Sequence, residues 1–316
     1  MEKAINQDRV KLALKVCHLY YEDGLSQSEI GKQLQISRPT ISRLLSYAKD
    51  TGLVKIEIAD PLKDLGTLAQ QLETKYHLKK ALISFDASND SQLINEKLGE
   101  LTADYLQTIV QDHDSIGISW GKTIKAVADH LHISTRNDVR IVQLKGSVAA
   151  SDMNNFANDI VTKFSAAYHT NAITLPLPVI FDDPVTKKIV LDDRFISQII
   201  QAGEKTNIAL FTSGTVRSDA MLFNLGYLNT AEISRLQVSS VGDIVSRFIT
   251  KSGAIADSSI NSRTVGIQLE ALKHKKYAIL VAGSSRKVPS IHGALVGGYA
   301  NVLITDSQSA TALLAL

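Results

Sequence analysis

Cysteine, signal-peptide-like segments and long apolar runs are scarce or absent in this 316-residue chain, and each absence excludes a class of protein. The single cysteine, Cys17, cannot form an internal disulfide and has no partners at metal-ligand spacing, which indicates a cytoplasmic location. No segment approaches the run of about 20 apolar residues that spans a bilayer, and the start of the chain has no signal-peptide stretch. The eight histidines are scattered. The sequence therefore predicts a cytoplasmic protein without a metal site or a membrane partner.

The chain also lacks an excess of one charge and the glycine-rich motifs that bind nucleotides. Its 34 lysines and arginines nearly balance its 32 aspartates and glutamates, and 44% of its residues are hydrophobic. This length and composition allow one small domain and one large domain, each with its own core. No stretch matches a Walker A loop or the GxGxxG fingerprint, so ATP, GTP and NAD are poor candidates as ligands.

The N-terminal segment carries the pattern of a helix-turn-helix followed by a wing. Ser26 or Ser28 can cap a first helix that ends near residue 35, and Ser37 with Pro39 predicts a second helix over residues 38–48. Residues 8–21 supply a supporting helix, and the alternating residues 53–58 predict the strand of a wing. The apolar positions of the second helix share its inner face: they are Ile41, Leu44, Leu45 and Ala48.

Outward side chains of this segment can bond phosphates or base edges, which predicts binding to double-stranded operator DNA. We expect DNA contacts from Ser26, Gln27, Ser37, Arg38, Thr40, Ser42, Arg43, Tyr47, Lys49 and Lys55. The alternative is a helical hairpin in an ordinary core, but the caps, the turn, the basic outward face and the wing all agree on DNA binding. Residues 1–60 hold nine basic against eight acidic side chains. Because one copy attracts DNA only weakly, we expect two or more copies of this module on one operator.

We expect residues 1–59 to form this winged helix-turn-helix domain and residues 60–316 to form a larger α/β effector-binding and oligomerisation domain. The helical pattern at 62–77 either connects the domains and contacts a second copy, or packs on its own chain. Apolar strand-like runs occur at 81–85, 115–119, 139–144, 172–177, 208–211, 240–245, 278–282 and 301–305. Helical patterns lie at about 92–111, 122–132, 154–168, 192–203, 264–273 and 289–298. This alternation predicts a mostly parallel sheet covered on both faces.

Small and polar residues follow most of these strands, at the edge of a parallel sheet where ligands bind. The loops are SWGKT (119–123), KGS (145–147), TSGT (212–215), GD (242–243), GSSRK (283–287) and TD (305–306). Glycine, serine and threonine just before a helix expose N–H and hydroxyl groups at the positive end of the helix dipole. One such loop is weak evidence for a ligand site, but several in one domain predict a site for an anionic small molecule.

Taken in order, six stretches resemble the SorC family of bacterial transcriptional regulators over nearly the whole chain. They are SQSEIGKQLQISRPTISRLLSYAKDTGLVKIEI (26–58), IGISWGKT (116–123), VQLKGS (142–147), VGDIVSRF (241–248), NSRTVGIQLEAL (261–272) and VAGSSRKVPSIHGALVGGYANVLITD (281–306). The resemblance implies an operator-binding homo-oligomer, a homodimer or homotetramer, that is controlled by a phosphorylated sugar. It also implies an effector domain similar in fold to sugar-phosphate isomerases. Residues 211–214 read FTSG, where the family more often has a Gly-x-Gly pattern.

The resemblance also implies which residues bind the effector. The expected pocket residues are Ser119, Trp120, Gly121, Thr123, Lys145, Gly146, Asp243, Arg247, Lys287 and Asp306. Arg247 and Lys287 are the candidates for phosphate charge, while Asp243 and Asp306 could accept sugar hydroxyls. Arg247 could instead form a structural ion pair with Asp243 or a neighbour.

Lys145 stands where members of this family usually have a neutral residue, often asparagine. A partly desolvated amine has a depressed pKa and can condense with an aldehyde as a Schiff base. Deoxypentose phosphates expose more open-chain aldehyde than ordinary pentose phosphates. We therefore expect deoxyribose 5-phosphate to bind reversibly at Lys145 and to induce a repressor of deoxyribonucleoside catabolism genes, without a cofactor.

Three alternatives stay open for Lys145. It could be an exposed strand-end lysine, or it could serve only as a phosphate cation for a related sugar phosphate such as a hexose or pentitol phosphate. The chain could also be a sugar-phosphate isomerase or aldolase-like enzyme. Such an enzyme needs a positioned acid or base, which nothing in the sequence marks, so we expect a regulator and not an enzyme.

Overall fold

The computed structural model describes residues 7–55, 61–85, 90–148 and 155–316. The chain divides into two compact units, Met1–Asp60 and Pro61–Leu316, which are described separately. None of the described helices is both long and apolar enough to cross a lipid bilayer.

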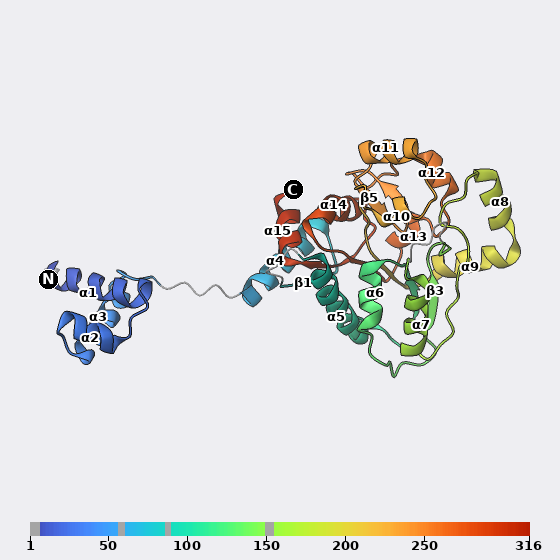
Figure 1. The fold of residues 1–316 in the computed structure, drawn as a ribbon. Helices are drawn as coiled ribbons and strands as arrows, with labels where there is room; N and C mark the ends of the chain where they lie inside the picture. The colour runs from blue at the N-terminus through green and yellow to red at the C-terminus, as the bar shows by residue number, and fades with distance from the viewer. Residues whose placement is uncertain (1–6, 56–60, 86–89, 149–154) are drawn as a thin grey trace. The chain divides into compact units, whose positions relative to one another are not determined.

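The first unit is a helix-turn-helix domain, as the capping pattern predicted (Figure 1, blue). It contains α1 (Gln7–Cys17), a π-helical turn (His18–Glu22), α2 (Gln27–Leu34) and α3 (Arg38–Asp50). Ser26 and Glu29 form a capping box at the start of α2, because each side chain accepts a hydrogen bond from the other's backbone N–H. Ser37 caps α3 by accepting from the N–H of Thr40 at 3.4 Å.

The predicted inner face of α3 is buried and forms the core of this unit. Ile41 and Ala48 are fully buried, as is Ile30 of α2, and Leu44 and Leu45 are nearly so. The turn between the two helices passes close to α2, since a side chain at Gly31 would lie 2.9 Å from the carbonyl oxygen of Ile36. The helical spacing of apolar residues therefore positions α2 and α3 against each other as the sequence predicted.

The wing is not formed where its strand was expected to begin. Residues 51–55 make a turn and a bend, with Gly52 at a φ of 75° and the N–H of Val54 donating to the carbonyl of Ala48 at 3.0 Å. Residues 56–58 lie outside the described residues, so the remainder of the wing stays a prediction.

A six-stranded parallel sheet forms the centre of the second unit (Figure 1). Its order is β1-β8-β7-β4-β2-β3. The strands are β1 (Lys80–Ser84), β2 (Ser115–Ile118), β3 (Arg140–Gln143), β4 (Ile208–Phe211), β7 (Tyr277–Val281) and β8 (Val302–Asp306). All six were predicted as strands, and all the pairings within this sheet are parallel. Their carboxyl ends therefore meet at one edge.

Helices connect and cover these strands. They are α4 (Pro61–Tyr76), α5 (Ser91–Ile109), α6 (Lys122–Asp129), α7 (Ala157–Ala167), α8 (Pro184–Asp192), α9 (Arg194–Lys205), α10 (Met221–Asn224), α11 (Thr230–Ser239), α12 (Ser258–Arg263), α13 (Leu269–Lys273), α14 (Val288–Val296) and α15 (Ser307–Ala315). Helix α4 packs on its own unit, because Leu72 is fully buried and Lys75 donates to the carbonyls of Leu313 and Leu314. A contact of α4 with a second copy stays a prediction.

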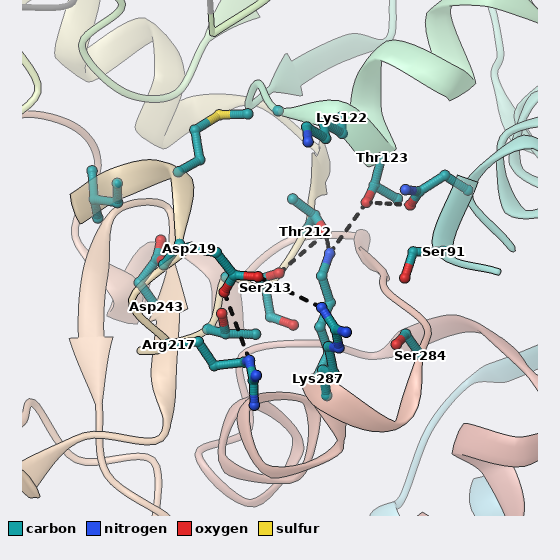
Figure 2. Close-up of a pocket in the computed structure, with 18 of the residues that line it drawn as sticks. Ser91, Lys122, Thr123, Thr212, Ser213, Arg217, Asp219, Asp243, Ser284 and Lys287 are labelled. Carbon is teal, nitrogen blue, oxygen red and sulfur yellow. Dashed lines mark hydrogen bonds and ion pairs between the residues drawn. The ribbon is translucent and has the colours of Figure 1, made fainter. Parts of the chain in front are cut away.

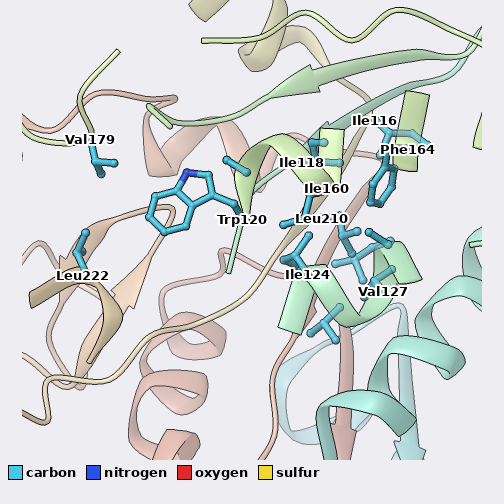
Figure 3. Close-up of a cluster of buried hydrophobic side chains, with 14 of the residues drawn as sticks. Ile116, Ile118, Trp120, Ile124, Val127, Ile160, Phe164, Val179, Leu210 and Leu222 are labelled. Atoms are coloured by element: carbon cyan, nitrogen blue, oxygen red, sulfur yellow. The ribbon is translucent and has the colours of Figure 1, made fainter. Parts of the chain in front are cut away.

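Each face of the sheet has its own hydrophobic core, and successive strand residues alternate between the two. In β4, Ile208 and Leu210 join the core that includes side chains of α5, α6 and α7, of which Figure 3 shows a part. Ala209 and Phe211 join the opposite core, with side chains of α4, α14 and α15. This two-sided burial explains why the central strands read as continuous apolar runs.

Three predicted elements differ from the structure. Residues 172–177 form no strand and make only a single bridge, Ile173 to Val142, because Pro176 and Pro178 interrupt the run and have no N–H to donate. The run at 240–245 contributes β5 (Gly242–Ile244), which pairs antiparallel with β6 (Arg247–Ile249) outside the main sheet. Residues 264–268, which lie between α12 and α13, are not helical, because their backbone bonds with other segments of the chain.

Candidate functional site

A cavity of about 240 Å³ opens at the carboxyl-terminal edge of the sheet (Figure 2). Its walls come from loops that follow β2, β3, β4 and β7, from the start of α5 and from the β5–β6 hairpin. Six of the residues expected to bind the effector line it: Trp120, Gly121, Thr123, Lys145, Asp243 and Lys287. The strand-end loops thus meet at one cavity, as the parallel topology predicts.

Lys145 is a buried amine in the wall of this cavity. Only 5% of its surface is exposed, its Nζ donates to Ser246 Oγ at 3.0 Å, and the same atom lies 3.6 Å from the centre of the Trp120 ring. Burial lowers the pKa of Lys145 to about 8, although the negative charge of Asp243 acts in the opposite direction. A substantial fraction of this amine is therefore neutral and nucleophilic slightly above neutral pH.

The β5–β6 hairpin brings two polar groups to Lys145 through a strained turn. Val245 and Ser246 form its two-residue loop with φ values of 49° and 63°, a conformation that usually selects asparagine and glycine. The N–H of Ser246 donates to Asp243 Oδ2 at 3.1 Å, while its hydroxyl accepts from Lys145. Such strain is common where a turn must place functional side chains.

Lys287 is a second, half-buried amine in the wall of the cavity (Figure 2). Its Nζ donates to Thr123 Oγ1 at 3.2 Å and to Thr212 Oγ1 at 3.4 Å, and Thr123 in turn donates to Asn95 Oδ1 at 2.8 Å. Burial lowers the pKa of Lys287 to about 8, against the attraction of Asp243. Because its hydrogen-bond partners in the described chain are neutral hydroxyls, Lys287 can still pair with an anionic ligand.

The cavity as a whole is electropositive. Five cationic side chains line it against two carboxylates: Lys122, Lys145, Arg217, Arg286 and Lys287 against Asp219 and Asp243. Asp219 lies near both arginines, 3.6 Å from Arg217 and 3.5 Å from Arg286, and these three side chains are all more than half exposed. Helix α6 also begins here, at Gly121, without a side-chain cap. Excess positive charge and an uncapped helix N-terminus both suit a phosphate group.

Three expected pocket residues do not line the cavity, and two of them, Gly146 and Asp306, hold loops that do. Ser119 is buried after β2, and its hydroxyl has no hydrogen-bond partner among the described residues. The carbonyl of Gly146 accepts from the Trp120 indole N–H at 2.8 Å, and a side chain at this position would collide with the backbone of Pro178. Asp306 caps α15 and accepts from the N–H of Ser284 at 2.8 Å. These contacts fix the loops that carry Trp120 and Ser284.

Arg247 points away from the cavity, and it pairs with backbone and amide oxygens instead of Asp243. It is 1% exposed, and its guanidinium donates to Ile267 O at 2.9 Å, Gly266 O at 3.0 Å and Asn261 Oδ1 at 2.6 Å. Burial lowers the pKa of Arg247 to about 10. Among the described residues Arg247 forms no ion pair with Asp243, and it does not line the cavity, so its phosphate contact stays a prediction. The side chain ties β6 to the segment before α13.

Arg247→Ala should destabilise the second unit without a direct effect on the ligand. Loss of the guanidinium leaves buried acceptors unpaired, so we expect the free energy of unfolding to fall by about 2–4 kcal/mol in urea titrations. Arg217→Ala is the control, because this arginine is exposed and should change stability by less than about 0.5 kcal/mol. Loss of effector binding with unchanged stability in Arg247→Ala would instead support the phosphate role.

Several cavity residues were not identified from the sequence. Lys122, Ser284 and Arg286 belong to strand-end loops that were recognised, but their side chains were not singled out. Ser91, Asn95, Asp219 and Ser246 have no local signal, because their position depends on long-range packing. They are brought in by the start of α5, the loop before α10 and the β5–β6 hairpin.

The buried amine of Lys145 should make stability depend on pH. Its folded pKa lies below its unfolded value, so the unfolded chain binds more protons between about pH 8 and 10 and stability rises with pH in that window. Relative to Lys145→Met, the wild type should gain about 2 kcal/mol between pH 8 and 10 in urea unfolding. Lys122→Met, which changes an exposed lysine of the same cavity, should follow the wild type. A constant difference between wild type and Lys145→Met would contradict the shifted pKa.

The expected DNA-binding face of the first unit is largely exposed. Eight of the ten expected contacts are exposed, while Gln27 and Tyr47 are half-buried. The Arg9 guanidinium lies 4.3 Å from the centre of the Tyr47 ring, so Tyr47 packs partly within its own unit. The hydroxyls of Ser26 and Ser37 are occupied as helix caps. Arg38, Ser42 and Arg43 are exposed on α3, and Thr40 is exposed with its hydroxyl bonded to Ser37. Their contacts with base edges stay a prediction.

Comparison with known proteins finds a matching family for each of the two units. A family model described as "Putative sugar-binding domain" matches residues 60–315, and one described as "MarR family" matches residues 18–61. The chain is 45% identical to the deoxyribonucleoside regulator of Bacillus subtilis (strain 168), over 98% of this chain and 99% of that protein. It is 28% identical to the sorbitol operon regulator of Klebsiella pneumoniae, over 98% and 99% of the two chains. The crystal structure of full-length SorC from Klebsiella pneumoniae matches with a TM-score of 0.74 at 26% identity, over 99% of this chain and 100% of that chain.

Together, the fold and the matched domains define a DNA-binding transcriptional regulator that responds to a sugar. The chain belongs to the SorC family, as its six motifs indicated.

Proposed function

We propose that this protein represses genes for deoxyribonucleoside catabolism and releases its operator when deoxyribose 5-phosphate forms a Schiff base with Lys145. The observation that carries the proposal is the environment of Lys145, a buried amine with a pKa of about 8 in the wall of a cationic cavity. The name of the 45% identical relative, a deoxyribonucleoside regulator, agrees with this effector. No cofactor is needed, because the lysine itself supplies the reactive group.

The two ends of the cavity suit the two ends of such a sugar. The amine of Lys145 lies against Trp120 beside Asp243, where an open-chain aldehyde would react. Lys287 contacts Thr123 in the first turn of α6, whose uncapped start would stabilise a phosphate. The sugar would therefore bind with its aldehyde toward Lys145 and its phosphate toward Lys287.

A thermal-shift panel of sugar phosphates tests the choice of effector. A ligand that binds only the folded state stabilises it by about 2.7 kcal/mol at a hundredfold excess over its Kd, so the melting temperature rises with concentration. We expect a clear rise with deoxyribose 5-phosphate and smaller rises with ribose 5-phosphate and with hexose or pentitol phosphates. A larger rise with one of the other sugars would assign the regulator to another pathway.

Borohydride reduction followed by mass spectrometry tests the covalent bond. We expect an adduct on Lys145 in the presence of deoxyribose 5-phosphate. An adduct at another lysine, or none, would remove the Schiff base and leave a non-covalent effector.

Operator binding and turnover distinguish a regulator from an enzyme. A regulator loses operator affinity on adding deoxyribose 5-phosphate and leaves the sugar intact, whereas an aldolase or isomerase consumes it. Sedimentation of the complex with operator DNA would show whether a dimer or tetramer binds. We expect more than one copy, because residues 1–60 have a net charge of only +1.

A further inference from the structure

Asp243 is the buried carboxylate of the cavity. It is 7% exposed, whereas the side chain of Asp219, on the same cavity, is 63% exposed and lies near Arg217 and Arg286. Gly214 packs directly against Asp243, since a side chain at Gly214 would collide with Asp243 Oδ1. The carboxyl group is thus held in one place, and no lysine forms an ion pair with it among the described residues.

Ser246 connects this carboxyl group with the amine of Lys145. The Ser246 backbone N–H donates to Asp243 Oδ2 at 3.1 Å, and the Ser246 hydroxyl accepts from Lys145 Nζ at 3.0 Å. Trp120 covers another side of the amine, with its ring centre 3.6 Å from Nζ. A carbonyl carbon attacked by Lys145 would therefore form its new bond in a part of the cavity wall that also holds the Trp120 ring and the Asp243 carboxyl.

We propose that Asp243 is the catalytic residue that transfers the proton when Lys145 condenses with the aldehyde of its effector. This inference rests on the proposed function, because it concerns the same Schiff base. The Asp243 carboxylate first takes up a proton from the Lys145 ammonium group. Lys145 then attacks the aldehyde carbon as a neutral amine, an N–C bond forms as the C=O π bond breaks, and one amine proton moves to the former carbonyl oxygen to give a carbinolamine. Asp243 then donates its proton to that hydroxyl, the C–O bond breaks, and water leaves. The nitrogen lone pair completes the C=N bond, which leaves an iminium cation beside the Asp243 carboxylate.

The surroundings of Asp243 and Lys145 suit this proton transfer. Burial raises the pKa of Asp243, while Lys145, Lys287 and the hydrogen bond from Ser246 oppose that rise. The product is a cation over the face of Trp120 that is attracted by the Asp243 carboxylate, and both groups stabilise positive charge. Lys287 is half-buried in the same cavity, but its ammonium group donates to the hydroxyls of Thr123 and Thr212. The remaining charged groups of the lining, Lys122, Arg217, Arg286 and Asp219, belong to its exposed part.

The test is the rate at which the borohydride-trapped adduct accumulates with deoxyribose 5-phosphate. In Asp243→Asn we expect this rate to fall about 10²–10⁴-fold, the range typical of a lost general acid. Asp219→Asn removes the other carboxylate of the cavity and should stay within about threefold of the wild type. Asp243→Glu keeps the acid and should recover part of the rate.

The direction of the change separates proton transfer from a purely electrostatic role. Asp243 raises the pKa of Lys145, so its removal leaves more neutral amine. If Asp243 acted only through its charge, Asp243→Asn would form the adduct faster at neutral pH. A rate equal to or above that of the wild type would therefore overturn the proposal.

A non-reactive analogue separates catalysis from binding. Deoxyribitol 5-phosphate has no aldehyde, so its affinity reports only non-covalent contacts, and we expect Asp243→Asn to keep it within about fivefold of the wild type. Loss of this affinity would show that Asp243 binds a sugar hydroxyl, which would overturn the catalytic role. If the wild type forms no adduct, the covalent part of the proposed function fails as well. If it forms one at the same rate as Asp243→Asn, only the role of Asp243 fails.

Discussion

Lys145→Met should abolish the borohydride-trapped adduct and leave operator binding nearly insensitive to deoxyribose 5-phosphate. Methionine keeps an unbranched apolar stem against Trp120 but has no nucleophile. We expect the sugar concentration for half-release of the operator to rise at least about 100-fold, which corresponds to about 2.7 kcal/mol of lost coupling. Electrophoretic mobility shifts with labelled operator, titrated with the sugar phosphate, measure this change.

The matched control is Lys122→Met, which removes a positive charge from the same cavity without removing the buried amine. It should still form the adduct and respond to the sugar, with a modest loss of affinity. Operator affinity without effector should be unchanged in Lys145→Met, because Lys145 belongs to the second unit. A normal sugar response in Lys145→Met would show that the effector binds without a covalent bond.

The double variant Arg38→Ala/Arg43→Ala should lose most specific operator binding. Both side chains are exposed on α3, the helix expected to enter the major groove. Each arginine contact with a base edge is worth about 1–3 kcal/mol, so the pair should cost about 2–6 kcal/mol per bound subunit. The fold should persist, because the buried face of α3 is untouched.

A double variant of equal charge, Lys11→Ala/Lys15→Ala on α1, distinguishes recognition from general attraction to phosphates. Both lysines are exposed, and their removal should weaken all DNA sequences alike and reduce the salt slope by at most about 2. If this control lost as much specific binding as the α3 variant, then α3 would not be the recognition helix.

Much of the fold could be predicted because its signals are local. The caps at Ser26 and Ser37 set the starts of α2 and α3, and each needs only the three residues that follow it. The six strands of the main sheet could be recognised because strands buried on both faces are continuous apolar runs. Six of the residues that line the cavity could be predicted from this sheet topology together with the family resemblance.

Long-range pairing explains what could not be predicted. Ser246 is 101 residues from Lys145 along the chain, and nothing near either residue shows that their side chains are in contact. Arg247 sits in a motif that the family resemblance linked to the pocket, but the carbonyls of Gly266 and Ile267 take its hydrogen bonds. The run at 172–177 is apolar enough for a strand, yet Pro176 within it has no N–H to donate to a ladder.

Trp120 is the one tryptophan of the chain, and its place at the site has a practical consequence. Its ring faces the amine of Lys145, and its indole N–H is fixed to the carbonyl of Gly146. Any change in the charge or bonding of that amine alters the electric field at this one fluorophore. The protein thus carries its own optical reporter at the effector site, and the arrival of a sugar can be followed in the unlabelled, full-length chain as a change in intrinsic emission.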